Sequence, residues 1–184
     1  MVDVLWVVVG AVVLAVLAAV FYYNGFRVAL NRIENAWAQI DVQLKRRNDL
    51  IPNLIETVKG YVKHEKGVLE EVTRARTSMM NAGSVQEKAA ASNLLSGALK
   101  SLFAVAENYP QLKANENFLA LQEELSSTEN KIAFSRQHYN DSVLEYNNSI
   151  QVIPGLWFAG AFGFARKEML ATPEAERAVP KVKF

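Results

Sequence analysis

The stretch Ala36–Tyr61, AWAQIDVQLKRRNDLIPNLIETVKGY, keeps a helical rhythm although it contains two residues that helices avoid. Pro52 has no backbone N–H to donate, and Gly60 costs roughly 1 kcal/mol in a helix interior. A stripe in alternating steps of four and three nevertheless passes both of them, which is heptad spacing typical of coiled coils. Its positions are Ile33, Trp37, Ile40, Leu44, Arg47, Ile51, Leu54, Val58, Tyr61, Glu65, Val68, Val72, Ala75 and Met79.

The stripe favours one long helix over this region, and this helix can be continuous with the segment before it. It passes Pro52, Gly60 and Gly67 without a change of phase, which is improbable if separate helices began and ended there. In this interpretation Pro52 lies on the outer side of the helix, frees the carbonyl of Asn48 and bends the rod. The alternative is a break, with Asn48 or Asp49 as the N-cap and Pro52 in the first turn.

The residues before the stripe predict a transmembrane anchor over 1–25. Val4–Tyr23, VLWVVVGAVVLAVLAAVFYY, carries no charge, and about 20 apolar helical residues cross the hydrocarbon core of a bilayer. A cleaved signal peptide is the alternative, but such peptides open with a positive region and here Asp3 precedes the run. The residues that we assign to the span or to its aromatic ends are Val4, Leu5, Trp6, Leu14, Phe21, Tyr22 and Tyr23.

The positive charges predict the orientation of this span. No Lys or Arg precedes the apolar run, whereas Arg27, Arg32 and the cluster Lys45–Arg47 follow it closely. Cytoplasmic flanks of membrane spans carry an excess of Lys and Arg. We therefore expect a single-pass protein whose N-terminus faces out and whose remaining residues lie in the cytoplasm.

Two further helices follow the turn signal NAGS at 81–84. The first covers Val85–Glu107, is rich in Ala and Leu, and stops before Tyr109 and Pro110. Asn115 is a plausible N-cap for the second, which runs to about Val152, where Pro154 and Gly155 stop it. Its stripe consists of Phe118, Leu121, Leu125, Thr128, Ile132, Ser135, Tyr139, Ser142, Tyr146 and Ser149.

No strand-like alternation competes with these helices. The sequence therefore predicts an all-α chain, with the transmembrane helix followed by an antiparallel bundle of long helices over 26–153. The bundle has three segments, or four if the first is broken near Pro52. Within it, Arg47 and Glu65 fall on an inner face, and Arg47 is expected to pair with an acid such as Glu129 on the facing helix. The other interpretation of Arg47 is a buried charged site that a protein or ion uses.

Composition and motifs speak against an enzyme. The 184 residues carry a net charge of +1 and no cysteine, so neither nucleic-acid binding nor thiol chemistry is indicated. His64 lacks a second His one turn later, and neither His64 nor His138 has the Glu-x-x-His spacing of di-iron bundles. We expect no catalytic residues, no cofactor and no metal site.

The last segment, 154–184, combines an aromatic, glycine-rich stretch with an extended tail. PGLWFAGAFGFARKEM, at 154–169, is too short to span a bilayer, but it could lie in the membrane interface, cap the bundle or contact another subunit. TPEAERAVPKVKF has little to pack and reads as an extended tail. The candidate interface residues of the chain are Arg46, Arg47, Leu156, Trp157, Phe158, Phe162, Phe164, Arg166, Lys167 and Phe184.

Four segments carry a resemblance to a known family: NAWAQIDVQLKRRNDLIPNLIETVKGYVKHE, ARTSMMNA, ENYPQLKANENFLALQEELSSTENKIAFSRQHYNDSVLEYN, and the closing FGFARKEM with PKVKF. On these segments the chain resembles the bacterial LemA family over essentially its whole length, span included. The resemblance implies an N-terminal membrane helix in the bacterial inner membrane and a cytoplasmic bundle of long helices. It implies no enzymatic activity or cofactor, and one branch of the family takes part in forming magnetosome membranes.

Two functions of different classes fit this sequence. The first is a membrane-anchored scaffold that self-associates and organises or remodels the bilayer, because the span contains Gly10 and many alanines that can pack against a copy. The alternative is a monomeric adaptor that presents its bundle or its PKVKF tail to a membrane-protein complex. The expected partners are thus the lipid bilayer and a second copy of the chain, with another membrane protein in the adaptor alternative, but no nucleic acid.

Overall fold

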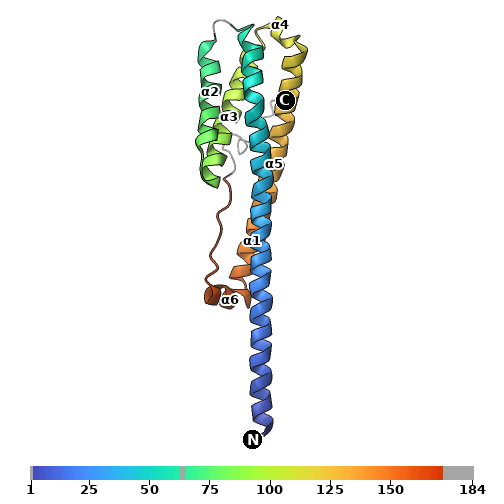
Figure 1. Ribbon diagram of the computed structural model, residues 1–184, viewed down its shortest axis with the longest axis vertical. Helices are drawn as coiled ribbons and strands as arrows, with labels where there is room; N and C mark the ends of the chain where they lie inside the picture. Colours follow the sequence, from blue (N-terminus) through green and yellow to red (C-terminus); the bar gives the residue numbers. More distant parts are fainter. Residues whose placement is uncertain (1, 63–64, 172–184) are drawn as a thin grey trace, which may run out of the picture. The chain divides into compact units, whose positions relative to one another are not determined.

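The computed structural model describes residues 2–62 and 65–171, and within these ranges the chain is helical with no strand (Figure 1). The expectation of an all-α fold is confirmed. The helices are α1 (Val2–Lys59), α2 (Lys66–Asn81), α3 (Val85–Ala106), α4 (Pro110–Lys113), α5 (Glu116–Gln151) and α6 (Gly155–Phe162).

Helix α1 continues through Pro52, so the interpretation of a break with an N-cap at Asn48 or Asp49 is wrong. The missing N–H of Pro52 costs one backbone hydrogen bond. Its neighbours Ile51 and Leu54 are fully buried on the inner side of the helix. Packing on that side offsets the cost of the proline, which is itself half-buried.

The expectation that the same helix also passes Gly60 and Gly67 is wrong. Helix α1 ends at Lys59 and α2 begins at Lys66, so the break lies after Gly60 and not near Pro52. If α1 continued straight, the helix would lengthen by 1.5 Å per residue, and the apolar face of α2 would lie beyond the core. Reversing the chain instead buries Val62 and Val72 in one cluster, and Glu65 lies between the helices instead of on an inner face.

The chain divides into two compact units. Within the described residues, unit 1 comprises 2–36 and Gln137–Met169, and unit 2 comprises Trp37–Arg136 with Leu170 and Ala171. Helices α1 and α5 therefore contribute residues to both units. The predicted domain boundaries after residues 25 and 153 stay predictions.

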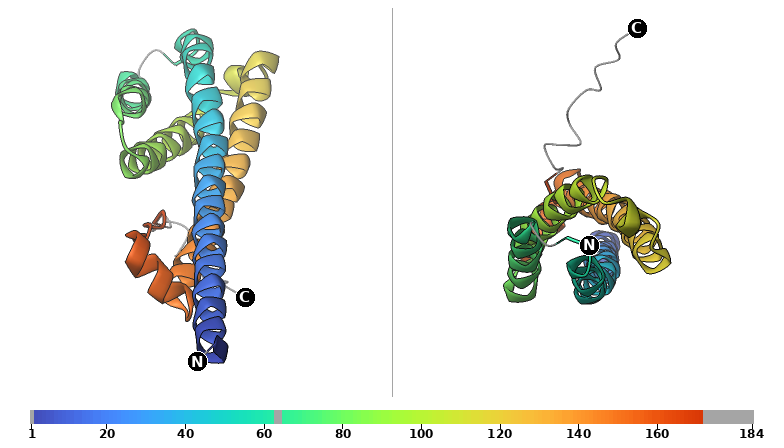
Figure 2. Two further views of the ribbon diagram at one scale, coloured as in Figure 1. Left: turned by 60° about the horizontal axis from the view of Figure 1, so that its bottom comes forward. Right: turned by 90° about the horizontal axis from the view of Figure 1, so that it is seen from above.

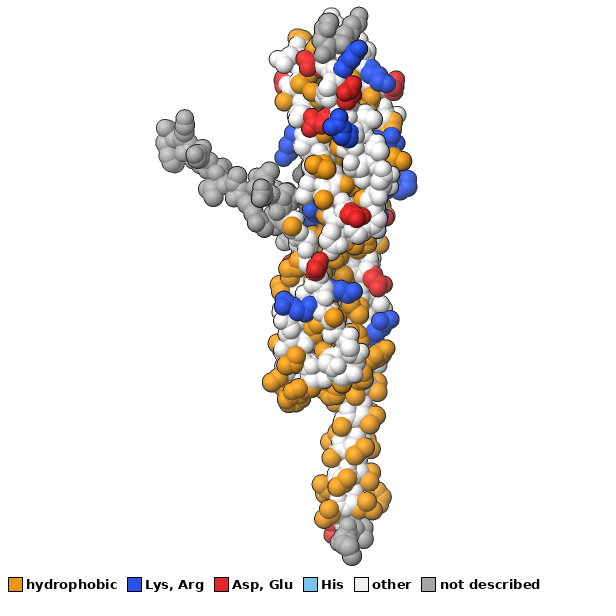
Figure 3. Space-filling model, turned by 90° about the vertical axis from the view of Figure 1, so that its left-hand side faces the viewer, with side chains coloured by type: hydrophobic (Ala, Val, Ile, Leu, Met, Phe, Trp, Pro, Cys, Tyr) orange, Lys and Arg blue, Asp and Glu red, His pale blue; other side chains and the backbone are white. Residues whose placement is uncertain are grey.

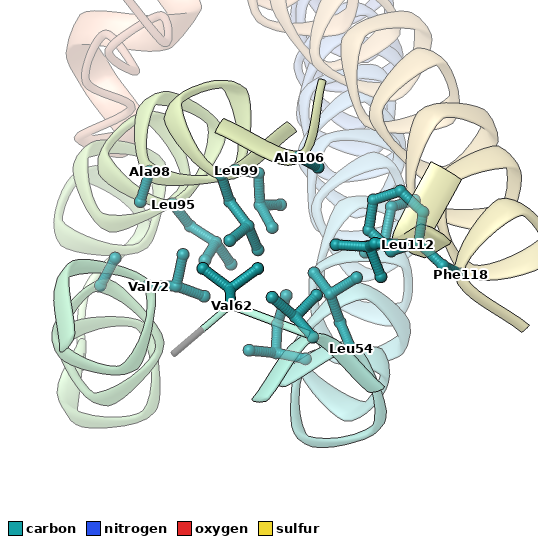
Figure 4. Packing of buried hydrophobic residues seen from close by; sticks show 14 residues of the cluster. Leu54, Val62, Val72, Leu95, Ala98, Leu99, Ala106, Leu112 and Phe118 are labelled. Carbon is teal, nitrogen blue, oxygen red and sulfur yellow. The ribbon is translucent and has the colours of Figure 1, made fainter. Parts of the chain in front are cut away.

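The core of unit 2 is assembled from helices α1 to α5. Leu54 of α1, Val72 of α2 and Leu95 of α3 have no exposed surface and meet in one cluster, with α2 beside α3 (Figures 2 and 4). Leu112 and Phe118 close the cluster from α4 and the start of α5. Burial of such side chains supplies the main stabilisation of a helical bundle.

Side-chain caps mark the starts of α3 and α5 in unit 2. Ser84 caps α3 in a capping box, because its hydroxyl accepts from the Glu87 N–H at 3.1 Å while the Glu87 carboxylate accepts from the Ser84 N–H at 3.0 Å. Asn115 caps α5 by accepting from the Phe118 N–H at 3.0 Å. Its side-chain amide also donates to the Tyr61 hydroxyl at 3.0 Å, which ties the end of α1 to the start of α5.

Candidate membrane-boundary site

The apolar run Val4–Tyr23 lies within α1 and belongs to unit 1. None of its most apolar 18-residue window is buried against the rest of the protein. Leu14 and Phe21, for instance, are 69% and 73% exposed. Hydrophobic side chains cover this part of α1 in Figure 3. The run has the length and composition of a membrane span.

Helix α3 also has the length and apolar composition of a span, but 39% of its window is buried. Its buried residues Leu95, Leu99 and Leu102 are members of the unit 2 core. Helix α3 is therefore the amphipathic bundle helix that the sequence predicts. Its last helical residue is Ala106, one residue before the predicted end.

Aromatic side chains at the end of the apolar run pack against α6 and the residues after it. Phe158 stacks on Tyr22 with ring centroids 4.9 Å apart and planes 10° from parallel. Phe162 meets Tyr23 edge-on at 5.3 Å. Phe164 completes the group with edge contacts to Tyr23 at 5.7 Å and to Phe26 at 5.1 Å. We call Tyr22, Tyr23, Phe26, Phe158, Phe162 and Phe164 the aromatic cluster.

The structure thus joins two sets of residues that the sequence analysis treats separately, the aromatic end of the span and the glycine-rich segment. Phe26, which is 2% exposed, is absent from the predicted sites. A signal for it exists, because Phe26 follows Tyr22 by four residues and so shares a helix face with it.

The corner between α5 and α6 depends on a glycine. A Cβ atom added to Gly155 would lie 2.1 Å from the carbonyl oxygen of Ser149 and 3.5 Å from the Phe26 ring. Only a residue without a side chain permits this approach. At the other end of α6, Gly163 closes the helix with φ of 72°, in the left-handed region that favours glycine.

Hydrogen bonds hold the chain that follows α6 against α5. The Tyr146 hydroxyl donates to the Ala165 carbonyl at 2.9 Å. The Asn147 side chain donates to the Lys167 carbonyl at 2.8 Å and accepts from the Lys167 N–H at 2.9 Å. Tyr146 and Asn147 are both buried, so these bonds are shielded from water. The sequence carries no signal for the role of Asn147, because it lies beside the apolar stripe and not on it.

The remaining candidate interface residues of this segment lie at the surface of unit 1. Leu156 is 48% exposed and Trp157 is 65% exposed, and Arg166 and Lys167 are exposed as well. Phe184 lies outside the described residues, as does His64. Figure 3 shows hydrophobic side chains gathered in the region of α6.

A buried charge lies in unit 2. The Arg47 side chain has no exposed surface and forms an ion pair with Glu129, as the sequence predicts. One terminal nitrogen, Nη1, donates to Glu129 and to the Ser96 hydroxyl at 3.0 Å. The other, Nη2, donates to the Ser92 hydroxyl at 2.6 Å and the Ser92 carbonyl at 3.0 Å. Sequence reasoning missed Ser92 and Ser96, which lie one turn apart on α3.

The electrostatics of Arg47 follow from its burial. Loss of hydration lowers the pKa of its guanidinium, and the Glu129 carboxylate acts in the opposite direction. Arginine stays protonated through such shifts, so Arg47 is a permanent buried cation. Its neighbour Arg46 pairs with Glu124 at the surface, with half of its side chain exposed. The two adjacent arginines therefore have different environments.

Among residues 2–62 and 65–171, no group of three or more His, Cys, Asp or Glu side chains is placed to hold a metal ion.

The fold and the boundary site define a class, that of membrane-associated helical bundles with an apolar N-terminal helix. The LemA family model matches residues 36–184, and the chain belongs to the LemA family. The matched residues leave out the apolar run.

Named relatives agree with this assignment. Protein LemA of Metamycoplasma hominis is 29% identical over 65% of this chain. Magnetosome protein MamQ 2 of Paramagnetospirillum magneticum and magnetosome protein MamQ of Magnetospirillum gryphiswaldense are 24% and 22% identical over 79% of this chain. The matches span 55% of the LemA protein and 63% of each MamQ protein, and none of the names denotes an enzyme.

Proposed function

We propose that this protein is a non-enzymatic, membrane-anchored scaffold that self-associates and organises the bilayer around it. The observation that carries the proposal is that the apolar run and the buried face of unit 2 belong to one helix, α1. No flexible linker rich in Gly, Pro or Ser separates anchor and bundle. The magnetosome names of the MamQ relatives support a role in organising a membrane structure.

Exposed apolar side chains of unit 2 supply candidate contacts for a second copy. Phe134 of α5 is 74% exposed beside a groove that Gln43, Ser127 and Lys131 also line. Aromatic side chains, phenylalanine among them, are enriched in the buried cores of protein interfaces. Within the span, nothing lies near the position of a Cβ on Gly10, so a second helix can approach there.

Self-association is tested by the mass of the full chain in mild detergent, from light scattering and negative-stain microscopy. A defined particle of several copies is expected. Phe134→Ser should reduce its mass, whereas Ala133→Ser, at an exposed position of the same helix outside the groove, should not. A version lacking residues 1–25 shows whether the span is needed. One chain per micelle at high concentration would overturn the scaffold and favour the adaptor.

For the orientation we propose that the N-terminal side of the span faces out and that unit 2 lies in the cytoplasm of a bacterial cell. The support is the excess of Lys and Arg after the span, including Arg27 and Arg32. The chain has no cysteine, so any labelled thiol in a single-cysteine variant is the introduced one. With a membrane-impermeant maleimide, Asp3→Cys should react in intact cells and Lys100→Cys only after lysis. The reverse pattern would overturn the orientation.

A further inference from the structure

We propose that residues 152–164 form a second membrane contact, in which the outer face of α6 lies in the interfacial layer of the bilayer that α1 crosses. This inference rests on the membrane anchoring of the proposed function. From the sequence alone, this segment could contact the membrane, the bundle or another protein chain. The proposal assigns it to the membrane.

The position of α6 along α1 is the first support. Its ring contacts are with Tyr22 and Tyr23, the last residues of the apolar run, and the segment after it reaches Phe26. A span of about 20 residues that begins at Val4 leaves the hydrocarbon core at these tyrosines. The contacts therefore place α6 level with the headgroup region, where amphipathic and aromatic side chains are favoured.

The composition of the outer face is the second support. From Val152 to Phe164 the chain, VIPGLWFAGAFGF, contains no charged side chain, and the indole N–H of Trp157 is its one side-chain hydrogen-bonding group. Several of its large side chains are nevertheless exposed. They are Val152 (58%), Ile153 (66%), Leu156 (48%), Trp157 (65%) and Phe162 (43%). An apolar surface of this size in a short segment marks a contact with a partner or a membrane.

The segment is also held in place, which distinguishes it from a loose tail. The corner at Gly155 admits no side chain, and Gly163 closes α6 in the left-handed conformation. Beyond α6, the bonds of Tyr146 and Asn147 hold the backbone at Ala165 and Lys167. Buried hydrogen bonds therefore hold this segment in a position where its apolar side chains face outward. No other described part of unit 1 covers these side chains.

Continuity with the span favours lipid over a second copy. Near its end, the apolar run of unit 1 has exposed side chains at Val20 (53%) and Phe21 (73%). The ring contacts of α6 are made in the same region of α1. The apolar surface of α1 that a bilayer would cover therefore lies next to α6. Exposed cations at Arg27, Arg166 and Lys167 suit anionic headgroups, although Glu145 and Glu168 in the same unit reduce the net charge.

The test uses the full chain in vesicles of phosphatidylcholine with phosphatidylglycerol and a nitroxide on a single introduced thiol. Collisions of the nitroxide with oxygen, which concentrates in lipid, report exposure to the bilayer. Collisions with a water-soluble nickel complex report exposure to water. Trp157→Cys is the probe, Leu156→Cys repeats it in case the first variant folds poorly, and Leu14→Cys marks the span. Leu94→Cys is the matched control, because Leu94 is an exposed apolar residue of unit 2 (62%, against 65% for Trp157) and lies outside the groove beside Phe134.

The proposal predicts that the label at position 157 collides with nickel several-fold less than the label at 94 and more with oxygen. Equal nickel access at 157 and 94, with position 14 still protected, would overturn the interfacial contact and leave the anchor intact. Nickel access at 14 as well would overturn the anchor itself. Protection at 157 from both reagents, with spin–spin broadening between chains, would overturn lipid in favour of a second copy.

Discussion

Unit 2 buries a charged side chain, whereas unit 1 leaves large apolar side chains uncovered. In unit 2 the terminal guanidinium nitrogens of Arg47 reach Glu129, Ser92 and Ser96, so the cost of removing the charge from water is offset by an ion pair and hydrogen bonds. In unit 1, Trp157 and Ile153 have no cover, although the segment that carries them is firmly bonded to α5.

The difference indicates two solvents. Unit 2 surrounds the terminal nitrogens of its buried arginine with an ion pair and hydrogen bonds and distributes further ion pairs over its surface, as a bundle in water does. Unit 1 contains the exposed apolar run of α1, and in the proposal above its apolar surface is covered by lipid instead of protein. The following predictions test this contrast, from the largest effect to the smallest.

The largest effect is expected at the buried ion pair of unit 2. Glu129→Ala should lower the free energy of unfolding by about 3 kcal/mol, because it leaves the fully buried Arg47 without its counter-charge. The matched variant Glu124→Ala removes the partner of half-exposed Arg46 and should cost less than about 1 kcal/mol. Denaturant unfolding of the full chain in mild detergent measures both. Equal losses would contradict the distinction between a buried and a surface pair.

A smaller effect is expected at the corner of unit 1. Gly155→Ala should destabilise the α5–α6 packing by about 1–3 kcal/mol, because its Cβ would meet the Ser149 carbonyl. Amide hydrogen exchange should then accelerate at Lys167, whose N–H bonds to Asn147. Gly160→Ala is the control, since nothing lies within 4 Å of its Cβ position. Unchanged exchange in the Gly155 variant would show that the corner tolerates a side chain.

The cap of α3 should contribute less. Ser84→Ala removes the hydroxyl that accepts from the Glu87 N–H and should cost about 1 kcal/mol in unit 2. Ser101→Ala, at an exposed position within the same helix, should leave the stability unchanged or slightly raised. Unfolding midpoints of the two variants provide the measurement. A loss at Ser101 as large as that at Ser84 would speak against a capping effect.

The smallest expected effects are on pH dependence, and they have opposite signs in the two units. Burial, and secondly Glu168, raises the pKa of Tyr139 in unit 1. Its stabilising contribution is complete below the unfolded pKa of about 10 and is lost as the pH rises through the folded pKa. Backbone N–H groups of Gly83 and Ser84 lower the pKa of Glu87 in unit 2. Its contribution is present above about pH 4 and is lost as the pH falls through the folded pKa.

Unfolding midpoints measured across pH check these signs. Tyr139→Phe should flatten the alkaline limb and leave the acid limb alone, and Glu87→Gln should do the reverse. An alkaline limb that is unchanged in the Tyr139 variant would contradict the assignment.

Much of unit 2 could be predicted because the apolar stripes in its sequence indicate which side chains are buried. Phe118, Leu125 and Ile132 are buried at their predicted positions on α5, Asn115 caps that helix, and Arg47 pairs with Glu129. The break at Gly60 could not be predicted from the stripe, because two helices that bury the same face in one core preserve its phase.

Unit 1 was less predictable. The aromatic segment has no period, and its partners Tyr22 and Phe26 lie more than a hundred residues earlier in the chain. The role of Gly155 depends on the position of the Ser149 carbonyl, which no local pattern encodes.

The helical class, the apolar run, the end of α2 and the ends of α3 and α5 follow from the sequence, because they depend on composition, periodicity and caps within a few residues. Which surface remains open depends on the tertiary structure. The aromatic cluster covers one face of α6 and leaves Trp157 uncovered because contacts between distant segments, not neighbours in sequence, determine what each side chain meets.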